Sequence, residues 1–289
     1  MIEYTERCPG FIGSAENYEQ SEIVIIGAPM DLTVSYRPGT RQGPHAIRQA
    51  SHGLEEYSVD LDRDLAHYSY YDAGDVLLPF GAVKENLRRI SAVTATILSG
   101  GKTPFVLGGE HLISCAVIQE VAKNYPGLTV VHFDAHADLR EEFLGERFSH
   151  ATVMRRVVET VGGKNLYQFG IRSGTREEFV FARANTNTFI DRVVEPLMEN
   201  LPRLKGLPVY VSLDIDVADP SFAPGTGTPE PGGCSAREII MAVHLLGELD
   251  IVGFDLVEVS PLYDPSDRTA LLAAKLIREA IMSFGRVKS

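Results

Sequence analysis

Short β-branched apolar runs alternate with longer segments of helical periodicity along nearly the whole chain. This alternation predicts βαβ units and a parallel sheet that is covered on both faces by helices. The predicted strands are 23–26, 68–71, 104–107, 129–133, 166–171, 188–190, 209–215 and 251–257. The predicted helices are 40–51, 83–98, 112–125, 150–161, 175–184, 193–204, 235–246 and 268–282.

These units predict a single α/β domain spanning residues 1–289, because no linker or change of composition divides the chain. Domains of roughly 250–300 residues are common among α/β folds. Residues 1–20 show no clear period, and we expect either an N-terminal arm or a disordered tail there. A TIM barrel accommodates the same units. Both architectures place functional groups at the carboxyl ends of the strands.

Composition narrows the class of protein. A net charge of −12, from 39 acidic and 27 basic residues, argues against nucleic acid as a partner and is compatible with a cationic substrate. No apolar run approaches the ~18–20 residues that span a bilayer, and the first residues do not resemble a secretory signal. Cys8, Cys115 and Cys234 form no C-x-x-C pattern, which favours the reducing cytoplasm.

The predicted strand 129–133 runs directly into Asp134, His136 and Asp138. Because these residues alternate, an extended backbone would project all three side chains toward one side. Carboxylate oxygens and imidazole nitrogens together suit divalent ions such as manganese. The alternative is a polar strand end whose aspartates cap a helix.

Two other predicted strands end in similar residues. His111 follows strand 104–107 after two glycines that would permit a tight turn. Asp214 and Asp216 alternate at the end of strand 209–215, where two buried like charges are costly without a cation. Exposed aspartates at a sheet edge are the alternative. We interpret Glu110 as an acid at a helix N-terminus, with a residue that supports a neighbouring metal ligand as the alternative. We interpret His132 as a hydrogen-bonded core histidine.

Together these residues form a set of six candidate metal ligands: His111, Asp134, His136, Asp138, Asp214 and Asp216. One catalytic zinc ion typically needs only three protein ligands and a water. Four carboxylates would instead balance two divalent cations. The sequence therefore predicts a hydrolytic centre with two metal ions.

Several motifs, in order along the chain, resemble the signatures of the ureohydrolase (arginase/agmatinase) family. They are G-G-E-H at 108–111, D-A-H-A-D at 134–138, S-L-D-I-D-V-A-D-P at 212–220, A-P-G-T-G-T-P at 223–229 and D-L-V-E-V-S-P at 255–261. The resemblance implies a three-layer αβα sandwich around a mainly parallel eight-stranded sheet. It also implies two Mn²⁺ ions per chain and hydrolysis of a guanidino group to an amine and urea.

Roles for single residues follow from the same resemblance. It implies that His111, Asp134, Asp138 and Asp214 hold one manganese, and that Asp134, His136, Asp214 and Asp216 hold the other. Glu258 would pair with the planar guanidinium, unless it is a surface glutamate after a strand. His150 matches the proton-shuttle histidine of the family. Family members are commonly homo-oligomers, trimers or hexamers.

The choice of substrate depends on two segments. Residues 139–150 and 30–39 are similar to the agmatine-hydrolysing form of the family, so we predict agmatine hydrolysis to putrescine and urea in polyamine biosynthesis. Arginine and guanidinobutyrate are alternatives, since a substrate carboxylate could pair with Arg140 or Arg147. A non-catalytic metal-binding relative is a further alternative. A dinucleotide-binding dehydrogenase is disfavoured because no G-x-G-x-x-G follows the first strand.

Overall fold

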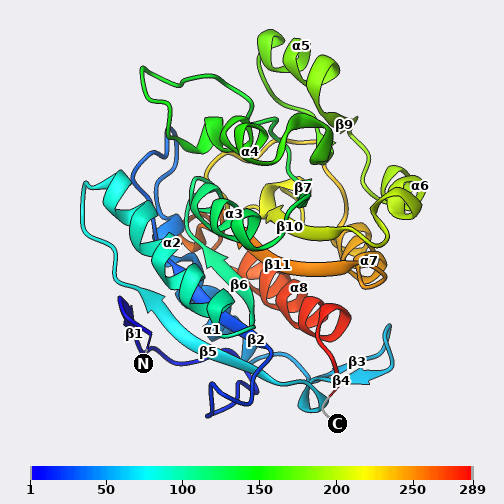
Figure 1. The fold of residues 1–289 in the computed structure, drawn as a ribbon. Helices are drawn as coiled ribbons and strands as arrows, with labels where there is room; N and C mark the ends of the chain where they lie inside the picture. Colours follow the sequence, from blue (N-terminus) through cyan, green and yellow to red (C-terminus); the bar gives the residue numbers. More distant parts are fainter. Residues whose placement is uncertain (1, 288–289) are drawn as a thin grey trace.

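A nine-stranded sheet runs through the centre of the molecule (Figure 1). The computed structural model describes residues 2–287. In spatial order, the strands are β1 (Thr5–Glu6), β5 (Tyr70–Val76), β2 (Ile23–Ala28), β6 (Thr103–Gly108), β11 (Asp250–Val257), β10 (Pro208–Asp214), β7 (Thr129–Phe133), β8 (Leu166–Ile171) and β9 (Asn187–Ile190). A separate hairpin pairs β3 (Tyr57–Ser58) with β4 (Arg63–Asp64).

Strands β2 and β5 to β11 all pair in parallel, whereas β1 lies antiparallel beside β5. The predicted eight parallel strands are therefore confirmed, and β1 extends the sheet at one edge. The sheet is open, with β1 and β9 at its two edges, so the TIM barrel alternative is wrong.

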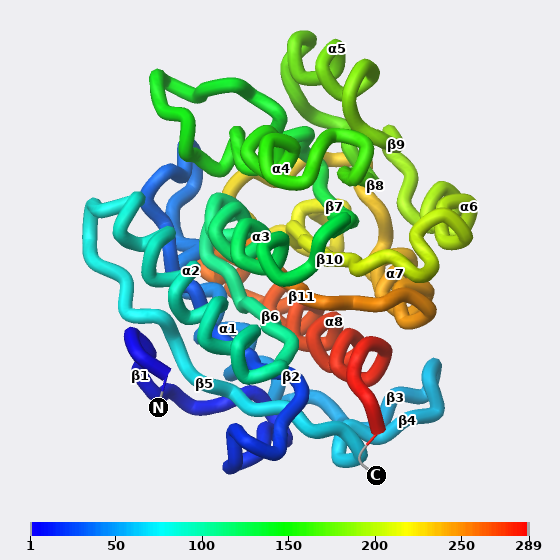
Figure 2. Tube along the Cα trace, viewed as in Figure 1, coloured from blue at the N-terminus to red at the C-terminus, as the bar shows by residue number. Residues whose placement is uncertain are grey.

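Helices cover both faces of the sheet (Figure 2). Against one face lie α2 (Val83–Ser99), α3 (Ile113–Asn124), α4 (Val153–Val161) and α5 (Arg176–Asn185). Against the other face lie α1 (Gly43–Ser51), α6 (Val194–Leu204), α7 (Ala236–Leu246) and α8 (Arg268–Phe284). Two apolar cores result, one on each face, because the alternating strand residues bury side chains on both sides. This is the predicted three-layer αβα sandwich.

Helix ends follow local sequence signals. α5 and α7 each begin with a capping box, formed by Thr175 with Glu178 and by Ser235 with Glu238, in which side chains satisfy free backbone N–H groups. Both starts agree with the prediction to within one residue. Within residues 2–287, no helix combines the length and the apolar character needed to cross a bilayer.

The N-terminal part of the sheet differs from the prediction. β5 continues to Val76 instead of ending before Asp72, because the carboxylates of Asp72 and Asp75 pair with the buried guanidinium of Arg48 at 2.8 and 2.6 Å. Charged residues can therefore remain inside the strand. In the segment that precedes β5 in the chain, β1 pairs with β5 and the side chain of Phe11 is buried.

A buried carboxylate ties α8 to α7 and to the small hairpin. Glu279 is fully buried and accepts hydrogen bonds from Ser58 Oγ (2.7 Å), His244 Nε2 (2.9 Å) and Lys275 Nζ (3.2 Å), and it also pairs with Arg278. Burial alone would raise the pKa of Glu279, but these donors outweigh it and lower the pKa from 4.5 to about 2. The charged form therefore stabilises the folded state.

We expect Glu279→Gln to lower the free energy of unfolding by about 3 kcal/mol at pH 7, because it removes one partner of a buried charge network. Since the folded pKa lies below the unfolded one, this stabilisation is complete above about pH 4.5 and is lost toward pH 2 at about 1.4 kcal/mol per unit. Urea unfolding at pH 7, 4 and 3 should show that the difference in the free energy of unfolding between wild type and variant becomes smaller as the pH falls. Glu248→Gln, on the exposed pair with Lys205, should change stability by less than about 1 kcal/mol at any pH.

Candidate metal centre

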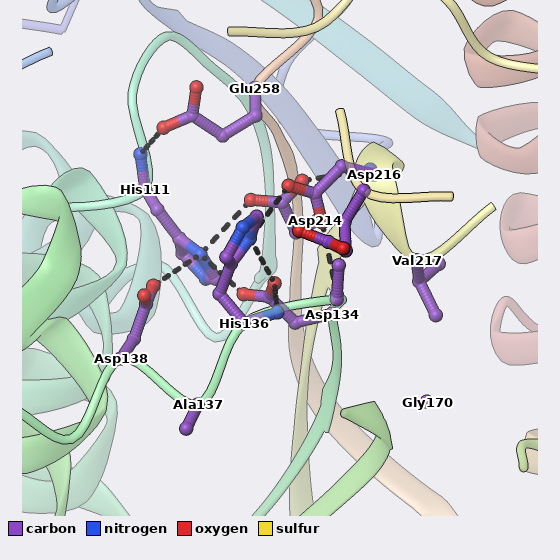
Figure 3. A network of polar contacts seen from close by, with 12 residues as sticks. His111, Asp134, His136, Ala137, Asp138, Gly170, Asp214, Asp216, Val217 and Glu258 are labelled. Carbon is purple, nitrogen blue, oxygen red and sulfur yellow. Dashed lines mark hydrogen bonds and ion pairs between the residues drawn. The ribbon is translucent and has the colours of Figure 1, made fainter. Parts of the chain in front are cut away.

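The six candidate ligands and Glu258 meet at the carboxyl ends of four neighbouring strands, β6, β11, β10 and β7 (Figure 3). These strands lie in the middle of the sheet, so their ends are surrounded by protein. His111 follows β6, Glu258 follows β11, Asp214 ends β10, and Asp134 follows β7. The strand order thus brings together residues that are as far as 147 positions apart in the chain.

One group of donors surrounds the His111 imidazole. Its Nδ1 lies 3.1 Å from an oxygen of Asp134, 3.3 Å from one of Asp138 and 3.2 Å from one of Asp214. All four side chains are buried, and His111 Nδ1 makes no hydrogen bond of good geometry. This set coincides with the first predicted group of ligands.

A second group lies beside the first. His136 Nδ1 is 3.0 Å from Asp216 Oδ2 and 3.4 Å from Asp134 Oδ1. Asp216 Oδ2 is buried without a hydrogen bond, whereas its other oxygen accepts the Ala135 N–H at 3.0 Å. Asp134 therefore faces both imidazoles, as a residue shared between two cations would.

The backbone does not bring these side chains together in the predicted way. β7 ends at Phe133, so Asp134 to Asp138 are not an extended strand, and Asp138 has a left-handed φ of 53°. β10 ends at Asp214, and a 3-10 helix, Ile215–Val217, places Asp216 in a turn. The expectation that alternation along a strand aligns these ligands is therefore wrong. They converge because tight turns follow the two strands.

Neighbouring residues hold the imidazoles in place. His111 Nε2 lies 3.0 Å from Ser212 Oγ, which in turn donates to Asp255 at 2.7 Å, so the opposite ring nitrogen is directed at the aspartates. His132 contacts Asp134 Oδ2 at 2.9 Å through Nε2 and Gln168 at 3.2 Å through Nδ1. Both of its ring nitrogens are engaged, which agrees with its interpretation as a hydrogen-bonded core histidine.

The charge balance of the site favours cations. Burial, together with the charge of Asp134, raises the pKa of Asp138 to about 7. Burial and then the carboxylates of Asp216 and Asp134 raise the pKa of Asp214 well above its usual value. Burial would lower the pKa of His136, but the same two carboxylates raise it to about 12. Negative charge is thus crowded here beyond what two imidazoles relieve, and divalent cations fit this donor set.

A cavity of about 260 Å³ opens above these groups, and Glu258 and His150 both line it. Glu258 has a left-handed φ of 65°, and one carboxylate oxygen accepts the His111 N–H at 2.7 Å (Figure 3). Burial, with the nearby carboxylate of Glu110, raises the pKa of Glu258 to about 8 despite that hydrogen bond. A guanidinium in the cavity would favour the ionised carboxylate.

His150 begins a 3-10 helix, His150–Thr152, that leads into α4. Its Nε2 lies 3.2 Å from Ser35 Oγ, and its ring meets Phe143 edge-on. Burial, followed by the charges of His136 and His111, lowers its pKa to about 4, although the contact with Thr33 opposes that shift. The imidazole is therefore neutral near pH 7.

Sequence reasoning gave no role to several residues that line the cavity. Ser35 and Thr228 lie in motifs quoted above, but nothing in their spacing assigned them to the site. Glu178 forms part of the capping box of α5 and also pairs with Arg140 at 3.2 Å. Arg147 pairs with Glu141 and Glu159 and is not among the lining residues.

Comparisons with known proteins point to one group of enzymes. Residues 21–283 match the model of the Arginase family. The chain is 50% identical to an agmatinase of Bacillus subtilis (strain 168) over 277 residues, which cover 95% of this chain and 96% of the relative. It is 36% identical to the proclavaminate amidinohydrolase of Streptomyces clavuligerus, with 92% and 88% covered. The crystal structure of the agmatine ureohydrolase of Thermoplasma volcanium superposes with a TM-score of 0.87 at 33% identity and covers 96% of this chain and 95% of that one.

Proposed function

The chain belongs to the arginase family, and from that premise we propose that it hydrolyses agmatine to putrescine and urea. The observation that carries this proposal is the convergence of four aspartates and two histidines beneath a cavity that Glu258 and His150 line. The high identity to a full-length agmatinase supports agmatine as the guanidino substrate.

We propose that two Mn²⁺ ions occupy this centre. His111 Nδ1 and Asp216 Oδ2 are buried and make no hydrogen bond of good geometry, which supports this proposal, as does the crowding of carboxylates. His111, Asp134, Asp138 and Asp214 would hold one ion, and His136 and Asp216 would hold the other together with Asp134 and Asp214. The chemistry that such a pair supplies when bound is the activation of water near neutral pH.

The residues around the cavity then act on the substrate. The free oxygen of Glu258 binds the guanidinium and orients its carbon toward the buried donors. His150, neutral in the free protein, can accept a proton and then deliver it to the departing amine. Protonation of that nitrogen is necessary because an amide-like anion is a poor leaving group.

The specificity is tested with a panel of guanidines. With manganese present, we expect kcat/KM for agmatine to exceed that for arginine at least about 100-fold, since each 1.4 kcal/mol of differential binding gives tenfold. Urea release measures each rate. Guanidinobutyrate is the informative third substrate, because Arg140, which pairs with Glu178 at 3.2 Å, lines the cavity and could meet a substrate carboxylate. A preference for arginine or guanidinobutyrate would assign the chain a different amidinohydrolase activity, and metal binding without urea release would indicate a non-catalytic relative.

We further propose that residues 1–289 act as one domain, in the cytoplasm, as a homo-oligomer of three or six chains. The three cysteines are free thiols, as a reducing compartment favours. Large apolar side chains such as Phe80 and Leu144 are almost fully exposed, and a second copy of the chain would bury them.

A further inference from the structure

A buried glutamate outside the ligand set anchors the loop that follows β2. Glu110 is fully buried next to His111, and it accepts hydrogen bonds from Leu32 N at 3.0 Å and Thr33 N at 2.9 Å. Its backbone N–H donates to Met30 O at 2.8 Å. Hydrogen bonds to a buried carboxylate are among the strongest that a protein makes, so this loop is held firmly at the carboxyl end of β6.

The arrangement differs from the role expected for Glu110. An acid at the N-terminus of α3 would accept from the first N–H groups of that helix, but both carboxylate oxygens of Glu110 are occupied by the loop. The preceding residue, Gly109, lets the loop after β2 come close enough to make these hydrogen bonds. A Cβ on Gly109 would lie 2.0 Å from Met30 O, so glycine is needed there for close approach and not for a left-handed turn.

The Thr33 hydroxyl links Glu110 to His150. It donates to Glu110 Oε2 at 2.5 Å and accepts the backbone N–H of His150 at 3.0 Å. Two residues later, Ser35 Oγ lies 3.2 Å from His150 Nε2. One short loop therefore fixes both the backbone and the ring of His150, and it is itself fixed by a residue adjacent to a candidate metal ligand.

We propose that Glu110, acting through Thr33, is a positioning residue that holds the His150 imidazole in the cavity that several candidate metal ligands also line. This inference rests on the proposed function, in which His150 carries the proton. Hydrogen bonds between Glu110 and Thr33 and between Thr33 and His150 connect His150 to the end of β6, the same strand that His111 follows.

Thr33→Val tests these hydrogen bonds because it keeps the shape of the Thr33 side chain and removes its hydroxyl. We expect kcat for agmatine to fall about 10- to 100-fold with KM changed less than about threefold, since small displacements of a catalytic group have effects of this size. Thr33→Ser should restore turnover. In a His150→Asn background, Thr33→Val should have no further effect, because the residue that it positions is already absent. Metal content per chain should stay at the wild-type value.

Thr94→Val is the matched control, since its buried hydroxyl donates to Ile90 O within α2, away from the cavity. It should leave turnover unchanged. A loss in the Thr33→Val, His150→Asn double variant equal to the product of the two single losses would overturn the proposal, as would full activity of Thr33→Val. If Thr33→Val does not fold, Thr33→Ala replaces it in the same cycle.

A readout without catalysis separates this inference from the proposed function. In the metal-free protein, the imidazole signals of His150, assigned in an NMR spectrum by their loss in His150→Asn, should move in Thr33→Val and remain in place in Thr33→Ser. An unmoved signal would refute the positioning role even in an active enzyme. Moved signals in a protein that releases no urea from any guanidine would support the contact while the proposed function fails.

Discussion

An Asp216→Asn variant should bind less manganese than wild type and lose at least about 10³-fold in kcat. The loss of several kcal/mol of transition-state stabilisation corresponds to this factor. Asp216 uses one oxygen to accept the Ala135 N–H, and an asparagine carbonyl can keep that bond. The other oxygen, which faces His136 Nδ1 at 3.0 Å, would become an amide NH₂ that cannot bind a cation. The substitution therefore removes a candidate ligand atom and leaves the turn intact.

Metal content measured by elemental analysis after dialysis, together with urea release, checks this prediction. Asp60→Asn provides the control. Asp60 is exposed in the turn between β3 and β4 and does not line the cavity. Its replacement should leave both quantities near the wild-type values. If Asp216→Asn retains full metal and turnover, the assignment of the second ligand group is wrong.

The fold was largely predictable because its signals are local. The strand and helix periods along the chain gave eight parallel strands and eight helices, and the predicted starts of α5 and α7 fall on the residues that form their capping boxes. β1 was missed because two residues carry no period. β5 was predicted too short because its aspartates suggested a loop, and only the structure shows Arg48 neutralising them from α1.

The candidate site was predictable for a different reason. The six candidate ligands could be named because the ends of neighbouring parallel strands meet at one edge, but the local geometry assumed for them was wrong. Asp138 itself has a left-handed backbone conformation, and Asp216 lies in a 3-10 turn. Neither conformation is predicted by the alternating pattern of a strand. Contacts such as Glu110 to Thr33 join residues 77 positions apart, and no local pattern reports them.

Substitution of His150 separates proton transfer from metal binding. We expect His150→Asn to lower kcat about 10²- to 10⁴-fold, the usual contribution of a general acid or base, with metal content unchanged. Asparagine keeps the backbone N–H that Thr33 accepts, so the loop should remain in place. KM should change little because, in the proposed function, Glu258 and not His150 carries the charge that binds the guanidinium. The variant thus removes an interaction made mainly in the transition state.

Steady-state urea release and metal analysis on the same preparation test this prediction, with His67→Asn as a control. His67 lies exposed in a 3-10 helix, Leu65–His67, outside the cavity, and its replacement should have no effect on either quantity. The contrast with Asp216→Asn is the decisive comparison, because one variant should lose metal and turnover together and the other turnover alone. A His150→Asn enzyme within about threefold of wild type would show that water or another group protonates the amine, since proton transfer by a positioned side chain should be worth far more.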